Sequence, residues 1–363
     1  MVKHEVPFPL KALERYIKSL YPGLKVRIKE ISLLGRGWHA EAWRISVLLG
    51  LEEKHLVLKF LKGERGFGHD YPADRAQVLL MAHKDFNELP NHIKSIDVGY
   101  LSEDGELHSV GNYKEFFILM EEARGAPYIR DMEAIRNRKA LIERDLKRLD
   151  MLVDYIVNVH KLKFEGDESS MRRLYFRRIR DLIGHGEMIF GVIDSAYSPN
   201  GPYAERLREL ERKVVEWRWR LKPFWKRLCR VHGDFHPFNI YFTEDDELIV
   251  MDRSRGRWGE AADDVSCLTI NFLWYALLER GSFKGPFANM FSKFLDKYLE
   301  RTNDDLLMKV IQPWFSFRAI VIASPLFYPE NPESVRNALI NFALNVLSLD
   351  RFEVDMIPEL LVA

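Results

Sequence analysis

The stretch that decides the fold is VHGDFHPFNIYF, residues 231–242, followed by LIVMD, residues 248–252. It places an acid, Asp234, and an amide, Asn239, on one loop between two apolar runs. A tight loop can aim both side chains at one point, and Asp252, at the end of the next strand, can face them. Carboxylate and amide oxygens suit Mg²⁺, and a placed carboxylate can orient a hydroxyl and accept its proton. The pattern therefore favours phosphoryl-transfer chemistry over a plain hairpin, in which Asp and Asn only form turns.

Residues 232–239, HGDFHPFN, resemble the catalytic loop H-G-D-x-H-x-x-N of the aminoglycoside phosphotransferase / choline kinase family. The resemblance implies a protein-kinase-like α+β fold, with a small antiparallel-sheet lobe and a large, mainly helical lobe. It implies that Asp234 is the catalytic base and that Asn239 and Asp252 are Mg²⁺ ligands. It also implies that His232 and His236 support the loop. Arg253 departs from the family, which usually has an aromatic residue there.

The segment WGEAADDVS, residues 258–266, resembles the family's G-D-P-x-x-D-L-A motif. Gly259 and Asp264 match, while Glu260 replaces the usual Asp. The resemblance implies that Asp264 is a structural acid that binds the backbone of the catalytic loop. A plainer interpretation of Asp263 and Asp264 is a helix N-cap followed by a first-turn acid, and both interpretations can hold together.

Lys59 lies in LVLKF, residues 56–60, which resembles the strand whose lysine binds the α- and β-phosphates of ATP. A strand lysine that extends to solvent is the plainer alternative. The family pairs this lysine with an acid on the next helix. We choose Asp74, with Asp70 and Glu64 as competitors that spacing does not separate.

Two further segments resemble nucleotide-binding elements of the family. Gly35 and Gly37 would form the turn over the triphosphate, since glycine lets backbone N–H groups approach phosphate oxygens. In FFILMEEARG, residues 116–125, the backbone of Glu121 to Ala123 would bind the adenine edge and Met120 would lie behind it. A hairpin turn and an edge strand are equally compatible with these two segments.

The first part of the chain reads as strands with one helix. Residues 25–34, 42–49 and 55–61 predict an antiparallel meander, and residues 74–86, after Pro72, predict a helix. Two more strands are expected at 93–100 and 116–121, with the turn Asp104-Gly105 between them.

After Gly125-Ala126-Pro127 the pattern becomes largely helical. We expect helices at 141–161, 203–229 and 263–280, two or three more between 284 and 349, and a strand pair at 240–242 and 248–251. The resulting architecture is a nucleotide-binding lobe, residues 1–122, and a catalytic and substrate-binding lobe, residues 123–363. A ligand is expected in the cleft between two such lobes.

Composition narrows the class of protein. The 363 residues carry 54 basic and 54 acidic side chains, so no overall charge draws the chain to nucleic acid or membrane. Two cysteines, Cys229 and Cys267, make no disulfide framework and are expected to be buried thiols. Charged side chains interrupt every apolar run at the start of the chain, so no signal peptide is expected there. The apolar segment 319–326, bounded by Arg318, is too short to span a bilayer. We expect a cytoplasmic protein; its oligomeric state is open.

Two basic regions invite a nucleic-acid interpretation. The simpler interpretation of residues 172–180, RRLYFRRIR, is a helix with its arginines in water and with Leu174, Phe176 and Ile179 near the core. Alternatively, the arginines could line a pocket for an anionic substrate. Tryptophans 217, 219 and 225, among basic residues, could stack on a sugar or ring. His160 is expected to pack against a helix.

The leading hypothesis is an ATP- and Mg²⁺-dependent phosphotransferase that acts on a hydroxyl of a small molecule. A protein Ser/Thr kinase is disfavoured because Asp252 and Asp264 are too close in sequence for a long activation segment. A pseudokinase, which binds nucleotide without turnover, is disfavoured because Asp234, Asn239, Asp252 and Lys59 are all present. The acceptor, and ATP against GTP, stay open.

Overall fold

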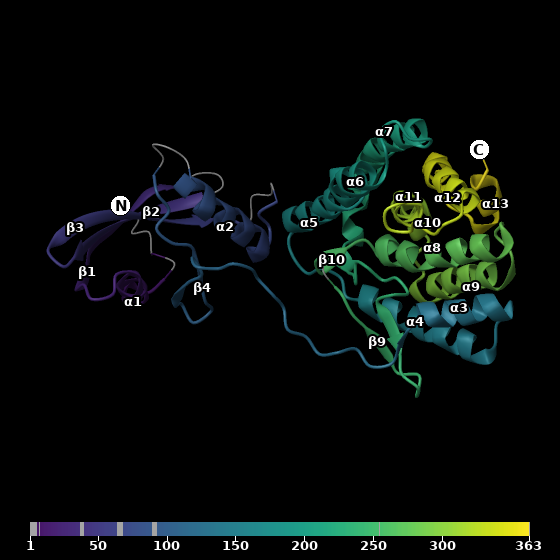
Figure 1. Cartoon of the computed structure of the whole chain (residues 1–363), viewed down its shortest axis with the longest axis horizontal. Helices are drawn as coiled ribbons and strands as arrows, with labels where there is room; N and C mark the ends of the chain where they lie inside the picture. The colour runs from purple at the N-terminus through teal and green to yellow at the C-terminus, as the bar shows by residue number, and fades with distance from the viewer. Residues whose placement is uncertain are drawn as a thin grey trace. The chain divides into compact units, whose positions relative to one another are not determined.

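The computed structural model describes residues 6, 8–36, 40–63, 68–88, 93–253 and 255–362. The chain divides into two compact units, Met1–Met120 and Glu121–Ala363, which we describe separately (Figure 1). The first holds a small antiparallel sheet and the second is mainly helical, which confirms the predicted α+β class. The assignment of nucleotide binding to residues 1–122 and of catalysis to residues 123–363 stays a prediction.

The first unit is built on the predicted meander. Strands β1 (Val26–Arg36), β2 (Ala40–Leu49) and β3 (Glu52–Leu61) form an antiparallel sheet in the order β1-β2-β3. Alternate residues of β2 are buried on one face of this sheet, because successive strand side chains point to opposite faces.

A helix that the sequence analysis missed belongs to the core of the same unit. Helix α1 (Leu10–Leu20) contributes the buried Leu13 and Ile17, which cluster with Ile45 and Val47 of β2. Its apolar side chains recur every three or four residues, which is the helical period. That signal was present in the sequence, but no helix was predicted there.

The remainder of the first unit is only partly as predicted. Helix α2 (Pro72–Glu88) confirms the expected helix. The strand expected at 93–100 is wrong except at its end, because only β4 (Gly99–Leu101) pairs, with β5 (Leu107–Ser109), around a turn where Gly105 has a φ of +85°. The strand expected at 116–121 is also wrong: this segment is irregular and exposed. An unbroken apolar run carries no alternation that would specify a strand.

The second unit contains most of the helices. They are α3 (Ile129–Arg138), α4 (Glu143–Lys161), α5 (Glu168–Asp181), the π-helix η1 (His185–Ile193), α6 (Asp194–Ala196), α7 (Ala204–Leu221), η2 (Lys222–Arg227), α8 (Ala261–Arg280), α9 (Gly285–Thr302), α10 (Leu307–Val310), α11 (Gln312–Ile322), α12 (Glu333–Asn345), η3 (Val346–Ser348), η4 (Val354–Met356) and α13 (Ile357–Leu360).

The predicted helices at 141–161 and 263–280 are confirmed, whereas the one at 203–229 is too long. Helix α7 ends at Leu221, and Pro223 lies at the start of the following 3₁₀ turn. Proline lacks the backbone N–H that would continue an α-helix. Between 284 and 349 the chain forms four α-helices, one more than the upper expectation.

Helix α8 is the centre of the second unit. Every residue from Ala261 to Leu277 is buried, and α9 and α11 pack against it (Figure 1). A helix that is apolar on all sides is expected in the middle of a helical unit. Its buried polar residues must therefore find partners inside the protein, and they do so at the site described next.

Short strands hold the loop that carries the motif. Strands β6 (Ala126–Pro127), β8 (Ile240–Phe242) and β9 (Leu248–Val250) form a three-stranded sheet, and β7 (Cys229–Arg230) pairs with β10 (Trp258–Gly259). Residues 231–239 run from β7 to β8. Both cysteines are free and buried, as predicted.

Candidate active site

His232 fixes the start of the motif loop. Its Nε2 lies 3.0 Å from the carbonyl oxygen of Met251, and its Nδ1 accepts a hydrogen bond of 3.2 Å from the backbone N–H of Asp234. The Nε2 nitrogen therefore carries the proton and donates it to Met251. Burial lowers the pKa of His232, which favours this neutral form.

Asp264 holds the same loop from the first turn of α8. Its two carboxylate oxygens accept hydrogen bonds from the backbone N–H groups of His232, at 2.7 Å, and Gly233, at 2.6 Å. His160 lies 3.0 Å from the same carboxylate and 2.8 Å from the hydroxyl of Tyr298. Burial opposes ionisation, but the contact with His160 and the loop N–H groups keep the pKa of Asp264 below its usual value. The buried acid thus fixes the loop backbone.

The backbone conformation at position 233 and the close approach of Arg178 both favour glycine there. The φ of Gly233 is +90°, and a Cβ at this position would lie 2.5 Å from Nη2 of Arg178. Arg178, on α5, is buried and donates to Asp263 at 2.8 Å and to the carbonyl oxygen of Arg255. The expectation that the arginines of this basic run lie in water is therefore wrong for Arg178. An acid that is completely buried on α8, Asp263, binds it.

Asp234, the predicted catalytic base, is bound by two arginines. Its Oδ1 lies 3.0 Å from Nη1 of Arg318 on α11 and 2.6 Å from Nη1 of Arg255. The Cys267 thiol lies 3.9 Å from the same oxygen. Among the described residues, Oδ2 has a single polar neighbour, His236, whose Nε2 lies at 3.5 Å. One carboxylate oxygen is thus fixed, and the other can accept a further hydrogen bond.

These contacts keep Asp234 ionised. Burial alone would raise its pKa, but the hydrogen bond with His236 and the charges of Arg318 and Arg255 outweigh burial and hold the pKa well below its usual value. A carboxylate with so low a pKa is charged throughout the physiological range. It is better suited to orient a hydroxyl and receive its proton late in the reaction than to deprotonate it beforehand.

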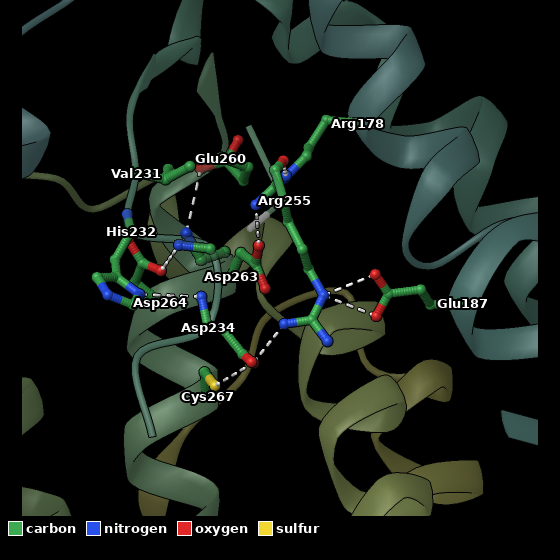
Figure 2. A network of polar contacts seen from close by, with 12 residues as sticks. Arg178, Glu187, Val231, His232, Asp234, Arg255, Glu260, Asp263, Asp264 and Cys267 are labelled. Atoms are coloured by element: carbon green, nitrogen blue, oxygen red, sulfur yellow. Dashed lines mark hydrogen bonds and ion pairs between the residues drawn. The ribbon is translucent and has the colours of Figure 1, made fainter. Parts of the chain in front are cut away.

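Arg255 links Asp234 to a second acid. Figure 2 shows its guanidinium between Asp234 and Glu187, with Nε 2.6 and 2.7 Å from the two Glu187 oxygens. Glu187 belongs to η1. The segment that follows Asp252 therefore folds back over the motif loop, and each acid in this group is matched by a cation.

Asp263 completes the network between the two buried arginines. Its Oδ1 accepts from Arg318 at 2.6 Å and its Oδ2 from Arg178 at 2.8 Å. Asp263 is not the helix N-cap that the plainer interpretation proposed. The cap is Glu260, whose side chain accepts from the N–H of Ala262 and which also binds Arg227 and the Tyr175 hydroxyl.

The two predicted metal ligands lie at the base of the β8–β9 hairpin. The backbone N–H of Met251 donates to the carbonyl oxygen of Asn239 at 3.0 Å, so Asp252 follows directly on the residue bonded to Asn239. The side-chain N–H of Asn239 donates to the carbonyl oxygen of Asp234 at 3.0 Å, which leaves its Oδ1 as an acceptor. Asp252 is exposed, with a φ of +60°, and makes no ion pair within the described residues.

The donor set fits Mg²⁺. An amide oxygen and a carboxylate are hard ligands, and Mg²⁺ at nucleotide sites needs only one or two protein ligands beside phosphate oxygens and water. Across the described ranges no three His, Cys, Asp or Glu side chains form a metal-holding cluster. Any metal here would therefore depend on the nucleotide for further ligands.

A cavity of about 610 Å³ opens beside Asp234, lined entirely by residues of the second unit. Its walls come from η1, the motif loop, α8 and α11. Asp234, His236 and Arg255 lie on it, as does Asn271 of α8. A space of this size beside a fixed carboxylate can hold a small molecule.

The predicted nucleotide residues of the first unit lie on or next to its sheet. Lys59 is exposed on β3 and makes no ion pair within the described part of the chain. Gly35 lies at a register shift of β1, opposite Ala42. Asp74, in the first turn of α2, accepts a hydrogen bond of 2.7 Å from the N–H of Tyr71. Gly37 and Glu64 lie outside the described residues.

The predicted adenine-binding residues lie where the two units join. Met120 ends the first unit, and its side chain is 65% exposed. Glu121 and Ala123 belong to an irregular segment that leads to Gly125, where φ is +95° and the backbone approaches that of Phe242. Their role in binding adenine stays a prediction.

Several residues of this site escaped the sequence analysis. Arg318 was noted only as the boundary of an apolar segment, and Arg255, Glu187 and Asn271 were not noted at all. Arg318 reaches Asp234 across 84 positions of sequence. The one usable signal was an arginine inside an otherwise apolar helix, because a charge there needs a buried partner.

Comparison with known proteins gives the family. The chain matches the family model APH, phosphotransferase enzyme family, over residues 101–283, just over half of its length and including the whole motif loop. The sheet of the first unit lies outside the match. No curated protein sequence matches the chain. Within the described residues no helix is both long and apolar enough to cross a bilayer.

Solved structures show low similarity. Glucosamine kinase is 15% identical, with a TM-score of 0.43, and the alignment covers 92% of this chain and 94% of that one. Amicoumacin kinase hAmiN is 13% identical, with a TM-score of 0.40 and coverage of 94% and 99%. The Plasmodium vivax ethanolamine kinase is 14% identical, with a TM-score of 0.38 and coverage of 92% and 85%. Because these scores are low, the assignment rests on the family model: the chain belongs to the phosphotransferase enzyme family.

Proposed function

We propose that this protein transfers the γ-phosphoryl group of ATP to a hydroxyl of a small molecule bound in the cavity beside Asp234. The observation that carries the proposal is the state of Asp234: ionised, fixed through Oδ1 by Arg318 and Arg255, and open at Oδ2 on the wall of a cavity of about 610 Å³. A hydroxyl that donates to Oδ2 would be oriented without any movement of the carboxylate. Positioning of this kind supplies much of the catalysis in phosphoryl transfer.

The reaction balances with groups that this chain provides. The acceptor oxygen forms a bond to the γ-phosphorus, the bond from that phosphorus to the β–γ bridging oxygen breaks, and ADP leaves. The hydroxyl proton passes to Oδ2 of Asp234 as the new bond forms. Asn239 and Asp252 would hold Mg²⁺, which supplies positive charge at the phosphate oxygens. His232 and Asp264 keep the loop in place during the transfer.

The nucleotide would use residues of the first unit and of the segment that joins the units. Lys59 would bind the α- and β-phosphates, with Asp74 as its acidic partner, and Gly35 and Gly37 would lie over the triphosphate. The backbone of Glu121 and Ala123, beside Met120, would bind adenine. Lys59 is exposed and forms no ion pair with any described residue, so it is available to phosphate. A location in the cytoplasm, where ATP is plentiful, agrees with this proposal.

The test is a coupled ADP-release screen of hydroxyl compounds with Mg-ATP, followed by phosphorus NMR of the product. The proposal predicts ADP formation that depends on an acceptor and a phosphate monoester on that acceptor. If the protein binds ATP but no compound in a broad screen is phosphorylated, the alternative of a nucleotide-binding module without turnover is supported instead. Phosphorylation of a Ser or Thr residue in a protein substrate would favour the protein-kinase alternative.

A further inference from the structure

The cavity beside Asp234 also contains information about the acceptor, and the inference drawn from it rests on the proposed function. Two carboxylate and two guanidinium side chains line it: Glu187, Asp234, Arg255 and Arg318. They already pair with one another, because Arg255 bridges Glu187 and Asp234 (Figure 2). Arg318 also binds Asp234. The lining therefore has two acids, two arginines and no net charge.

Groups behind the lining keep this balance. Arg318 is also bound by Asp263 at 2.6 Å, and Asp263 is in turn bound by Arg178 at 2.8 Å. Each acid of the lining already has at least one arginine, so an ammonium group of a ligand would gain less from either acid than from an unpaired one. A charged ligand entering this space would have to lose its water and compete with an existing pair.

The rest of the wall is largely apolar. Its side chains include Val192, Ile270, Phe317, Val321, Ile322 and Phe327. Surfaces of this kind are buried favourably by a ligand with an apolar body and offer nothing to a polycation. Recognition beyond the reacting hydroxyl must therefore come from the few polar atoms that remain.

Asn271 supplies one such atom. The residue is 3% exposed, and its side-chain N–H donates to the carbonyl oxygen of Cys267 at 2.7 Å, which fixes the amide. Its Oδ1 is buried and has no hydrogen-bond partner in the described part of the chain, although the residue lines the cavity. Buried acceptors normally have a donor, so this oxygen is suited to receive one from a ligand.

The position of Asn271 gives the spacing of that donor. Cys267, whose thiol lies 3.9 Å from Oδ1 of Asp234, is one turn of α8 before Asn271. Four residues advance an α-helix by roughly 6 Å. We therefore expect a distance of roughly 6 Å between the donor of the ligand and the hydroxyl that reacts.

We propose that the acceptor is an uncharged alcohol with an apolar body and a second hydrogen-bond donor, a hydroxyl or an amide N–H, which Asn271 Oδ1 accepts. Polycationic and anionic alcohols are poor acceptors in this site. The proposal concerns the chemical class of the acceptor and does not alter the roles of Asp234 or the nucleotide residues.

The test uses sets of alcohols that share a skeleton and differ in one terminal group. One set is hexanediol, hydroxyhexanamide, hexanol, aminohexanol and hydroxyhexanoate, and a second set places the same groups on benzyl alcohol. Binding to the full chain is measured by calorimetry, and turnover by ADP release with Mg-ATP. The uncharged compounds with a second donor should bind and react roughly 10- to 100-fold better than hexanol, the gain expected from one buried hydrogen bond, and better still than the charged ones.

Two substitutions at Asn271 sharpen the test. Asn271→Leu removes the acceptor and should abolish the advantage of hexanediol over hexanol. Asn271→Asp adds an acid that no arginine binds and should move the preference toward aminohexanol. The control is Thr269→Val on the same helix, which also loses a buried bond to the backbone, 2.7 Å to Val265, but does not line the cavity. It should leave the preference unchanged.

The outcomes separate this inference from the proposed function. The inference is overturned if the wild-type protein binds aminohexanol or hydroxyhexanoate as well as hexanediol or better. It is also overturned if Asn271→Leu keeps the preference for hexanediol over hexanol, or if no compound of either set binds. If uncharged diols bind through Asn271 but no ADP is released, the acceptor class stands as a ligand class and the proposed phosphotransfer fails.

Discussion

Arg318 Nη1 lies 3.0 Å from Oδ1 of Asp234, and Nη2 of the same guanidinium lies 2.6 Å from Asp263, although α11 and the motif loop are far apart in sequence. A single buried side chain thus ties the predicted catalytic residue to the centre of the helical unit. Because the arginine and Asp263 are both buried, the structure is sensitive to the loss of either one.

Arg318→Met should lower the free energy of unfolding by about 3–5 kcal/mol, the cost of leaving a buried acid short of its partner. Denaturant unfolding measures this. Adding Asp263→Asn should recover part of the loss, since the amide needs no cation. The control, Arg301→Met, removes a partly exposed pair with Asp154 and should cost about 0–1 kcal/mol. Equal losses in both single variants would contradict a buried network.

Arg255→Met should raise the pKa of Asp234, because the arginine favours the ionised carboxylate and burial favours the neutral one. A raised pKa moves the acid limb of the pH–rate profile to higher pH, so the variant should lose activity at acidic pH where the wild type keeps it. Arg257→Met, which removes an exposed cation from the same segment, should leave the limb in place. Identical limbs in the Arg255 variant and the wild type would show that Arg255 does not act on Asp234.

Gly233→Ala should unfold more easily than the matched Gly281→Ala. Both glycines have positive φ, +90° and +64°, but only at Gly233 does a Cβ meet a neighbour, 2.5 Å from Arg178, while at Gly281 nothing lies within 4 Å. Gly281→Ala should cost about 1–2 kcal/mol from backbone strain alone, and Gly233→Ala about 1–3 kcal/mol more from overpacking. The difference in the free energy of unfolding between the two variants, measured by thermal and denaturant unfolding, gives the cost of the steric clash. Equal costs would mean that Arg178 moves aside freely.

Asp246, in the turn between β8 and β9, should make a pH-dependent contribution to stability. Hydrogen bonds from Arg148, Arg144 and Lys147 lower its pKa to about 2. A lowered pKa in the folded state means stability that is present at neutral pH and is lost as the pH falls through about 2.

Asp246→Asn should therefore cost about 1 kcal/mol at neutral pH, allowing for partial exposure, and the difference should shrink as the pH falls and vanish below about pH 2. Asparagine also tolerates the φ of +63° at this position, so strain does not contribute. The control is Asp245→Asn, which removes the same charge at an exposed neighbouring position. A constant difference between the two variants at all pH values would contradict the electrostatic origin.

Local periodicity was enough to predict the sheet and the longest helices. The alternation in residues 25–34 and the runs at 42–49 and 55–61 predicted a meander, and the helical spacing in residues 141–161 predicted α4. Segments without a period were misread: the apolar run from Phe116 to Met120 looked like a strand but forms none. Pro223 marked the end of α7, and the prediction passed over it.

The candidate site was predictable where its residues are neighbours in sequence. Asp234, Asn239 and Asp252 lie on one loop and hairpin, and a motif records such spacing. Arg318 and Asn271 come from other helices, and their place beside Asp234 follows from tertiary packing that a single sequence does not encode locally. The acceptor cavity is built mostly from such residues, so its class could be proposed only from the structure.

The role of Asp234 is tested by measuring the turnover of Asp234→Ala together with its affinity for ATP. We expect phosphorylation of the acceptor to be lost, while ATP, which Asp234 is not proposed to hold, still binds with nearly wild-type affinity. Turnover close to that of the wild-type protein would contradict the assignment of Asp234 as the group that receives the hydroxyl proton.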